Sequence, residues 1–111
     1  MRITSFFIAF ILFLILPGCK KQQLGIPGKN EIWLEYQAFN PTQIVVTSGT
    51  TITFTNKDNQ NHTATSTGLF DSGVLKSGNT YTFKFTTKGT FFFFCNFHTT
   101  NNLEQGYILV Q

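Results

Sequence analysis

One thiol and two imidazoles are the side chains of this chain whose types and spacing could do chemistry. Cys95 is followed three residues later by His98, and His62 is the only other histidine. Two histidines and one cysteine form the ligand set of trigonal copper sites, although zinc accepts the same donors. Each residue also has an ordinary interpretation, because cysteine is often buried and inert and a lone histidine is often structural. No Ser-His-Asp order suggests a hydrolase.

The segments around these residues have the pattern of short β-strands. Apolar and polar residues alternate in the runs 32–36, 52–55 and 81–86, as in strands with one buried face. Gly49, Gly78 and Gly89 separate the runs, where a chain reversal can use positive φ. Fourteen phenylalanines and many threonines favour strands over helices. About seven strands at this spacing predict a β-sandwich or a small barrel over residues 31–111.

The predicted strands must bring the three candidate ligands together. His62 lies 33 residues before Cys95, which is too far for one local loop, so two strand ends must meet at one pole of the sandwich. Cys95 and His98 come from a single tight loop. Two-residue parity places Phe93 on the same strand face as Cys95, and we assign that face to the core.

The N-terminus has the layout of an export signal. Arg2 precedes an apolar run of eleven residues, Phe6–Leu16, which spans roughly 16 Å as a helix, about half of a bilayer core of ~30 Å. The sequence Leu16-Pro17-Gly18-Cys19 resembles a bacterial lipoprotein processing site, with an ordinary cleaved signal or a short anchor as the alternative. We expect a signal peptide over 1–18, lipid on Cys19, a tether over 19–30 and a place in the bacterial cell envelope.

Composition restricts the range of functions. The chain has 111 residues, which is room for one domain, and we expect a monomer. Only 12% of the residues are charged and the net charge is +3, with the basic residues scattered. Nucleic-acid binding needs clustered Lys and Arg to displace counterions from phosphates, so we expect no nucleic-acid partner.

From Phe39 to Val110 the chain resembles the cupredoxins, the small blue-copper proteins of the plastocyanin type. The matching motifs are Phe39-Asn40-Pro41-Thr42, Asn61-His62-Thr63, Phe70-Asp71-Ser72-Gly73, Cys95-x-x-His98 and Gly106–Val110. The resemblance implies an all-β Greek-key sandwich of seven to eight strands and one copper ion held by His62, Cys95 and His98. It also implies a one-electron carrier that serves a redox protein such as a cytochrome or an oxidase.

The fourth, axial position departs from the family pattern. Members usually carry a weak axial Met in the last loop, but here no Met follows Met1. Counting from Cys95 gives Leu103, counting back from Gly106 gives Glu104, and Gln105 is adjacent. We expect a non-coordinating Leu103, because burying a carboxylate without compensation is costly. Coordination by Glu104 would instead favour Cu(II), lower the potential and change the colour.

Two further hypotheses concern the surroundings and the function. We expect Thr63 and Asn96 to hydrogen-bond across the two ligand loops and stiffen the site. Besides an electron carrier, the sequence allows a copper-binding lipoprotein for storage or sensing, with exchangeable metal. It also allows a non-blue copper site that reacts with a small molecule, and Glu104 is the residue that would distinguish that case.

Overall fold

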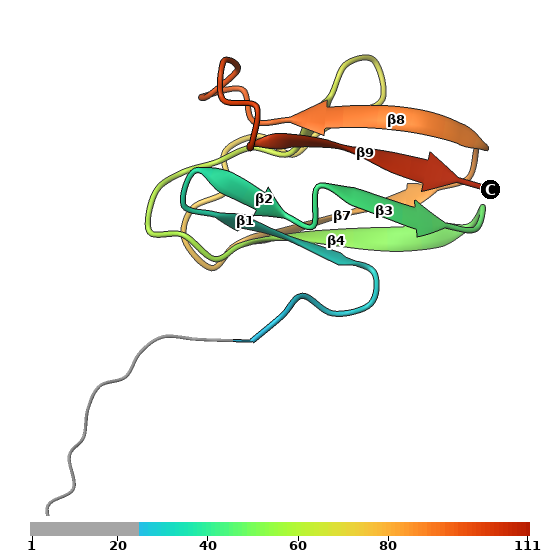
Figure 1. Ribbon diagram of the computed structural model, residues 1–111, viewed down its shortest axis with the longest axis horizontal. Helices are drawn as coiled ribbons and strands as arrows, with labels where there is room; N and C mark the ends of the chain where they lie inside the picture. The colour runs from blue at the N-terminus through green and yellow to red at the C-terminus, as the bar shows by residue number, and fades with distance from the viewer. Residues whose placement is uncertain (1–24) are drawn as a thin grey trace, which may run out of the picture.

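The computed structural model describes residues 25–111, which form nine β-strands (Figure 1). They are β1 (Glu31–Glu35), β2 (Ala38–Asn40), β3 (Gln43–Val46), β4 (Thr50–Asn56), β5 (Thr65–Ser66), β6 (Phe70–Asp71), β7 (Thr80–Phe85), β8 (Gly89–Phe94) and β9 (Gln105–Val110). This part of the chain holds no helix that could cross a membrane. The predicted signal peptide, Cys19 and the first half of the tether lie outside the described residues.

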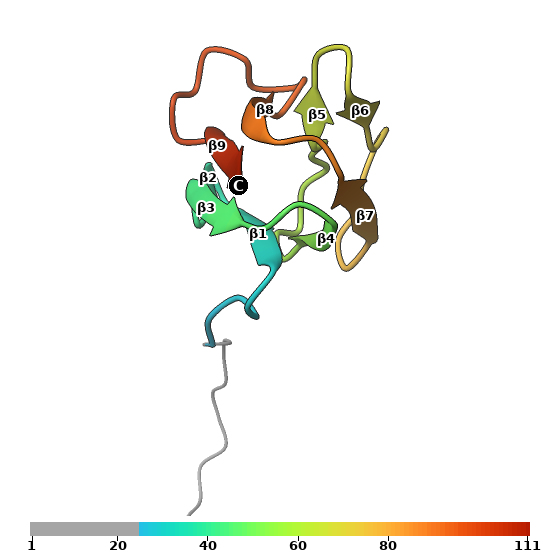
Figure 2. The ribbon, with the colours of Figure 1, turned by 90° about the vertical axis from the view of Figure 1, so that its right-hand side faces the viewer.

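Two mixed sheets pack face to face, which confirms the predicted all-β sandwich (Figure 2). One sheet has the order β2-β1-β4-β7 and the other has the order β3-β9-β8-β5-β6. The pairs β1 with β4 and β3 with β9 are parallel, and the other pairs are antiparallel. The strand number exceeds the expected seven or eight because β5 and β6, of two residues each, carry too little pattern to be recognised.

The core lies between the sheets and follows strand alternation. Ile32 and Leu34 of β1 are fully buried, as are Ile52 and Phe54 of β4. Burying each such side chain contributes about 1.5–3 kcal/mol relative to leaving it exposed. On β8 the predicted parity is confirmed, because Phe93 has no exposed surface. The face that β8 turns inward therefore continues directly to Cys95, which is also fully buried.

A close contact brings β9 against the segment before β3. Gly106 packs so tightly there that a Cβ atom would collide with the carbonyl oxygen of Thr42 and lie 2.8 Å from Cζ of Phe93. The backbone N–H of Tyr107 donates a 2.8 Å hydrogen bond to that same Thr42 carbonyl. Only glycine allows this approach, which fixes the strand that follows the Cys95–Glu104 loop.

Candidate metal centre

The segment after β4 turns His62 into the sandwich. Asn56, fully buried at the end of β4, donates from Nδ2 to the carbonyls of Gln60 and Leu75, each at 2.8 Å, and its Oδ1 accepts the N–H of Asp58. Beyond this turn the backbone of His62 pairs with that of Leu75 through two hydrogen bonds of 3.1 and 2.8 Å. The His62 side chain is left 1% exposed.

The second loop, residues 95–104, carries the other candidate ligands. Cys95 follows β8 directly, and its N–H donates to the carbonyl of Glu104 at 3.1 Å, which extends the β8–β9 ladder by one bond. The N–H of His98 donates to the Cys95 carbonyl at 3.2 Å and closes a tight turn. Both loops lie at the same end of the sandwich, the pole predicted from the strand spacing (Figure 1).

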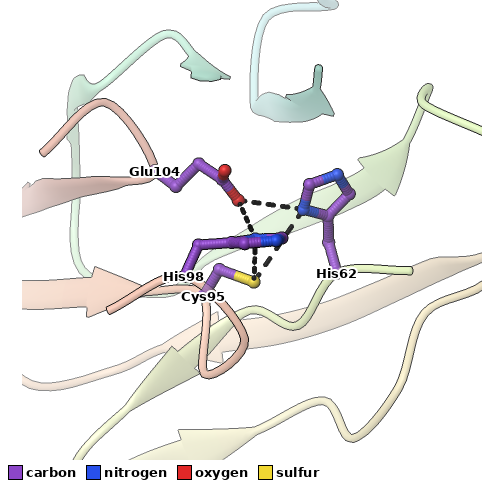
Figure 3. Close-up of side chains that lie close together, drawn as sticks. All are labelled: His62, Cys95, His98 and Glu104. Atoms are coloured by element: carbon purple, nitrogen blue, oxygen red, sulfur yellow. Dashed lines mark hydrogen bonds and ion pairs between the residues drawn. The ribbon is translucent and has the colours of Figure 1, made fainter. Parts of the chain in front are cut away.

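Four side chains converge at this pole (Figure 3). The sulfur of Cys95 lies 3.8 Å from Nδ1 of His62 and 3.5 Å from Nδ1 of His98. Oε1 of Glu104 lies 3.0 Å and 2.8 Å from the same two nitrogens. All four atoms lie within 4.8 Å of one another. A single ion with bonds of about 2.0–2.3 Å separates its ligands by roughly 3.3–3.8 Å, so small adjustments would let these four donors share one metal.

Glu104, and not the expected Leu103, places its side chain beside the three candidate ligands. Leu103 is 60% exposed and its side chain takes no part in the cluster, whereas Glu104 is 1% exposed. Hydrogen bonds to the Glu104 carboxylate offset the cost of burying it. Its Oε1 faces both imidazoles, and its Oε2 accepts a 2.9 Å hydrogen bond from Nδ2 of Asn101.

A signal for Glu104 was present in the sequence. The inward residues of β9 alternate, with Gly106, Ile108 and Val110 buried and Tyr107 exposed. Extending this two-residue period backwards by one step places Glu104 on the inward face and Leu103 on the other. The count from Cys95 that gave Leu103 did not use this alternation.

The surroundings change the pKa of the Cys95 thiol and of the His62 imidazole. Burial raises the pKa of the Cys95 thiol, but hydrogen bonds from His62, from the backbone N–H groups of Thr63 and Phe97, and from His98 outweigh it and lower the pKa to about 7. Burial likewise lowers the pKa of His62, but its bonds to Cys95 and Asp58 and the charge of Glu104 raise the pKa to about 9. The thiolate, which is the form that binds metals, is therefore accessible near neutral pH.

A second carboxylate, which the sequence did not single out, holds the far side of His62. Oδ2 of Asp58 lies 2.8 Å from Nε2 of His62, and Asp58 is 8% exposed. The bond from Nε2–H to this carboxylate leaves Nδ1 directed at Cys95 and Glu104. Such a partner fixes the ring orientation and the tautomer of a metal-binding histidine. In the sequence, the feature that could have indicated Asp58 is its position four residues before His62, at a turn.

Thr63 and Asn96 link the two ligand loops. Oγ1 of Thr63 accepts the N–H of Asn96 at 2.8 Å, and Nδ2 of Asn96 donates to Oγ1 of Thr65 at 3.1 Å. The two threonine hydroxyls lie 3.0 Å apart and share a hydrogen bond. These contacts tie the residue after His62 to the residue after Cys95.

The comparisons with known proteins agree with this architecture. A family model for the cupredoxin-like domain matches residues 6–110. The chain belongs to this family. No protein of curated function matches this cupredoxin.

Several solved structures share the cupredoxin fold. A novel purple cupredoxin from Nitrosopumilus maritimus is 24% identical with a TM-score of 0.67, and the match covers 73% of this chain and 98% of the other. A methionine-to-leucine variant of amicyanin in its oxidised state is 19% identical with a TM-score of 0.68, covering 78% of this chain and 86% of the other. A methionine-to-alanine variant of amicyanin with Cu(I) is 20% identical with a TM-score of 0.64, covering 73% and 80%.

The residues present fit the metal that this family implies. His62, Cys95 and His98 lie close together as potential copper ligands. Imidazole nitrogen and thiolate sulfur are the donors that copper accepts in both of its oxidation states. Cys95 has no disulfide in the described part of the chain, so its sulfur is available as a ligand.

Proposed function

We propose that this cupredoxin is a copper-binding, one-electron carrier whose metal is held by His62, Cys95, His98 and Glu104. The convergence of two imidazole nitrogens, one thiolate and one carboxylate oxygen within 4.8 Å carries the proposal. Copper bound there would supply a centre that alternates between Cu(I) and Cu(II). The chain holds the donors in place through the Thr63–Asn96 link and the Asn56 turn, which limits their rearrangement during electron transfer.

Burial supports a carrier over an enzyme or a storage protein. Cys95, His62 and Glu104 are each at most 1% exposed. The sequence associated Glu104 with a non-blue site that reacts with a small molecule. Here the carboxylate is buried and engaged by both histidines and by Asn101, so we favour a carrier over a reactive centre. A storage or sensing protein would need a site more open to metal exchange than this one.

His98 is the proposed route for electrons. Its side chain is 36% exposed, while that of His62 is 1% exposed. The neighbouring Phe97 is half exposed and its ring lies 6.4 Å from the His98 ring, edge to face. An apolar side chain beside an accessible ligand suits a brief encounter with a redox protein, such as a cytochrome or an oxidase, because such encounters use small interfaces.

Glu104 sets the expected potential and colour. The carboxylate and the Cys95 thiolate together place two negative charges at the site, and hard, charged oxygen favours Cu(II) over Cu(I). We therefore expect a lower reduction potential and a weaker blue band than those of a site with methionine or leucine in the axial position.

The test is an optical and electron-spin spectrum of the copper-loaded, oxidised protein, followed by a redox titration. We expect an intense visible absorption from the thiolate–copper bond and a reversible uptake of one electron per chain. The Cys95→Ala variant should lose that absorption and serves as the matched control. Persistence of the band in this variant, or release of the metal on reduction, would overturn the proposal.

We further propose that the protein is exported and anchored to a bacterial membrane through lipid on Cys19, as a monomer with its domain over residues 31–111. The apolar run Phe6–Leu16 and the Leu16-Pro17-Gly18-Cys19 sequence support this. Mass spectrometry of the protein from cells should find an acylated Cys19 at the new N-terminus. A Cys19→Ala variant should lose the lipid, and an intact N-terminus in the wild type would refute anchoring through lipid on Cys19.

A further inference from the structure

The carboxylate of Glu104 is held from both sides. Its Oε1 faces the two histidine nitrogens at 3.0 and 2.8 Å, and its Oε2 accepts a hydrogen bond from Nδ2 of Asn101 at 2.9 Å. Glu104 is 1% exposed, so water has little access to either oxygen. A buried carboxylate oxygen without a donor is costly, and Asn101 is the side chain that supplies this donor.

Asn101 is itself fixed, which determines the direction of its amide. Its Oδ1 accepts the N–H of Leu103 at 2.9 Å, so its Nδ2 must point the other way. There Nδ2 donates both to Glu104 and, at 3.2 Å, to the carbonyl of Gln37. The backbone adds two bonds, from Asn101 N–H to the His98 carbonyl at 2.9 Å and from Glu104 N–H to the Asn101 carbonyl at 3.0 Å.

Gln37 connects this network to the other sheet. It lies in the turn between β1 and β2 and has a φ of 56°, the one positive φ of a non-glycine residue in residues 25–111. Two residues later, in β2, the N–H of Phe39 donates to the Leu103 carbonyl at 2.8 Å. The ligand loop is therefore attached to the β1–β2 hairpin at two points, and one of them is the amide that holds Glu104.

We propose that Asn101 is a positioning residue that fixes the rotation of the Glu104 carboxylate, so that Oε1 alone faces the two histidine nitrogens. This inference rests on the proposed function, in which Oε1 binds the metal. Without the Asn101 amide, Oε2 would lose its donor and the carboxylate could turn to present either oxygen or both. A ligand held in several orientations gives a mixed and weaker site.

The experiment compares three variants of the full chain loaded with Cu(II). Asn101→Ala removes the donor. Asn101→Asp keeps an acceptor for the Leu103 N–H but directs a negative oxygen at Glu104, so it should have the larger effect. Asn102→Ala is the matched control, because Asn102 lies in the same loop and its side chain contacts Gln105 and not Glu104. We measure the Cu(II) dissociation constant, the electron-spin spectrum and the unfolding midpoint of the metal-free protein.

We expect Asn101→Ala to weaken Cu(II) binding by about tenfold and to broaden or split the electron-spin spectrum, while Asn102→Ala matches the wild type. In a Glu104→Gln background the effect of Asn101→Ala on affinity should largely disappear, because the two residues act through one contact. Wild-type spectra and affinity in both Asn101 variants would overturn the inference. The same loss of affinity with and without Glu104 would also overturn it, because the role would then be structural only.

The Glu104→Gln variant distinguishes a wrong ligand set from a wrong role for Asn101. If Glu104→Gln leaves the copper spectrum and affinity unchanged, Glu104 is not a ligand and the proposed ligand set is wrong. If Glu104→Gln changes them and the Asn101 variants do not, the ligand set stands and the positioning role of Asn101 is wrong.

Discussion

Replacing Glu104 with glutamine should raise the reduction potential of the copper site. Glutamine keeps the side-chain length and one carbonyl oxygen but removes the charge. In the wild type this charge is 1% exposed and its Oε1 lies within 3.0 Å of both histidine nitrogens. A negative charge at that place stabilises Cu(II) more than Cu(I), so its removal favours the reduced state.

The magnitude follows from the distances at the site. The four donor atoms lie within 4.8 Å of one another, and the charge of a carboxylate bound through Oε1 is centred roughly 3 Å from the ion. At an effective dielectric constant of about 20, that interaction amounts to roughly 5.5 kcal/mol. For a one-electron couple, about 59 mV corresponds to ~1.4 kcal/mol, so the expected rise is about 230 mV.

Potentiometric titration of the copper-loaded protein, followed in the visible band, measures this difference. The control is Glu31→Gln, which removes the same charge at the start of β1, the end of that strand away from His62. It should move the potential by a small fraction of the Glu104 effect, because screening weakens charges near the surface. If the two variants shift the potential equally, or if the potential of Glu104→Gln falls, the assignment of Glu104 beside the metal is refuted.

Three other predictions concern ionisation, packing and loop contacts. The raised pKa of His62 contributes stability that is fully present below pH 6.5 and is lost as the pH rises through about 9. The lowered pKa of Cys95 contributes stability that is fully present above pH 9.0 and is lost as the pH falls through about 7. Between about pH 7 and 9 the slopes of His62 and Cys95 oppose each other, and the raised pKa of His98 adds a decline of its own. The unfolding midpoint of the metal-free protein should therefore fall only gently there, and a steep change would contradict the thiolate–imidazolium pair. Gly106→Ala should destabilise the fold by about 3 kcal/mol or prevent folding, because its Cβ would collide with the Thr42 carbonyl, and a denaturant midpoint equal to the wild type would contradict that contact. Thr63→Ala should lower stability by about 1–3 kcal/mol and weaken Cu(II) binding, since the N–H that it accepts would lose its partner, and unchanged stability and metal affinity would show that the link between the ligand loops is dispensable.

Much of the fold could be predicted from local pattern. Alternation in the runs that became β1, β4 and β7 indicated strands with one buried face, and the burial of Ile32, Leu34 and Phe54 confirms which face that is. The parity of β8 likewise placed Phe93 and Cys95 inward. Such predictions succeed because the two-residue period of a strand is a property of the chain itself. The short strands β5 and β6 carry too few residues to show any period.

The sequence by itself determined three of the candidate donors, His62, Cys95 and His98, and their spacing along the chain. His62 and Cys95-x-x-His98, separated by predicted strands, are enough to indicate a metal site at one pole, because few other soft donors are present. The type of fold follows from the same alternation that separates them. None of this depends on the path of the loop after His98.

Only the tertiary structure showed that the Glu104 carboxylate lies beside these three side chains. Whether a carboxylate can be buried depends on the donors that meet it, and these come from His62, 42 residues away in sequence, from His98 and from Asn101. Asp58 behind His62 and the Gln37 turn behind Asn101 belong to the same network of long-range contacts. The cost of burying Glu104 was correctly recognised from sequence, but its compensation exists only once distant segments are folded together.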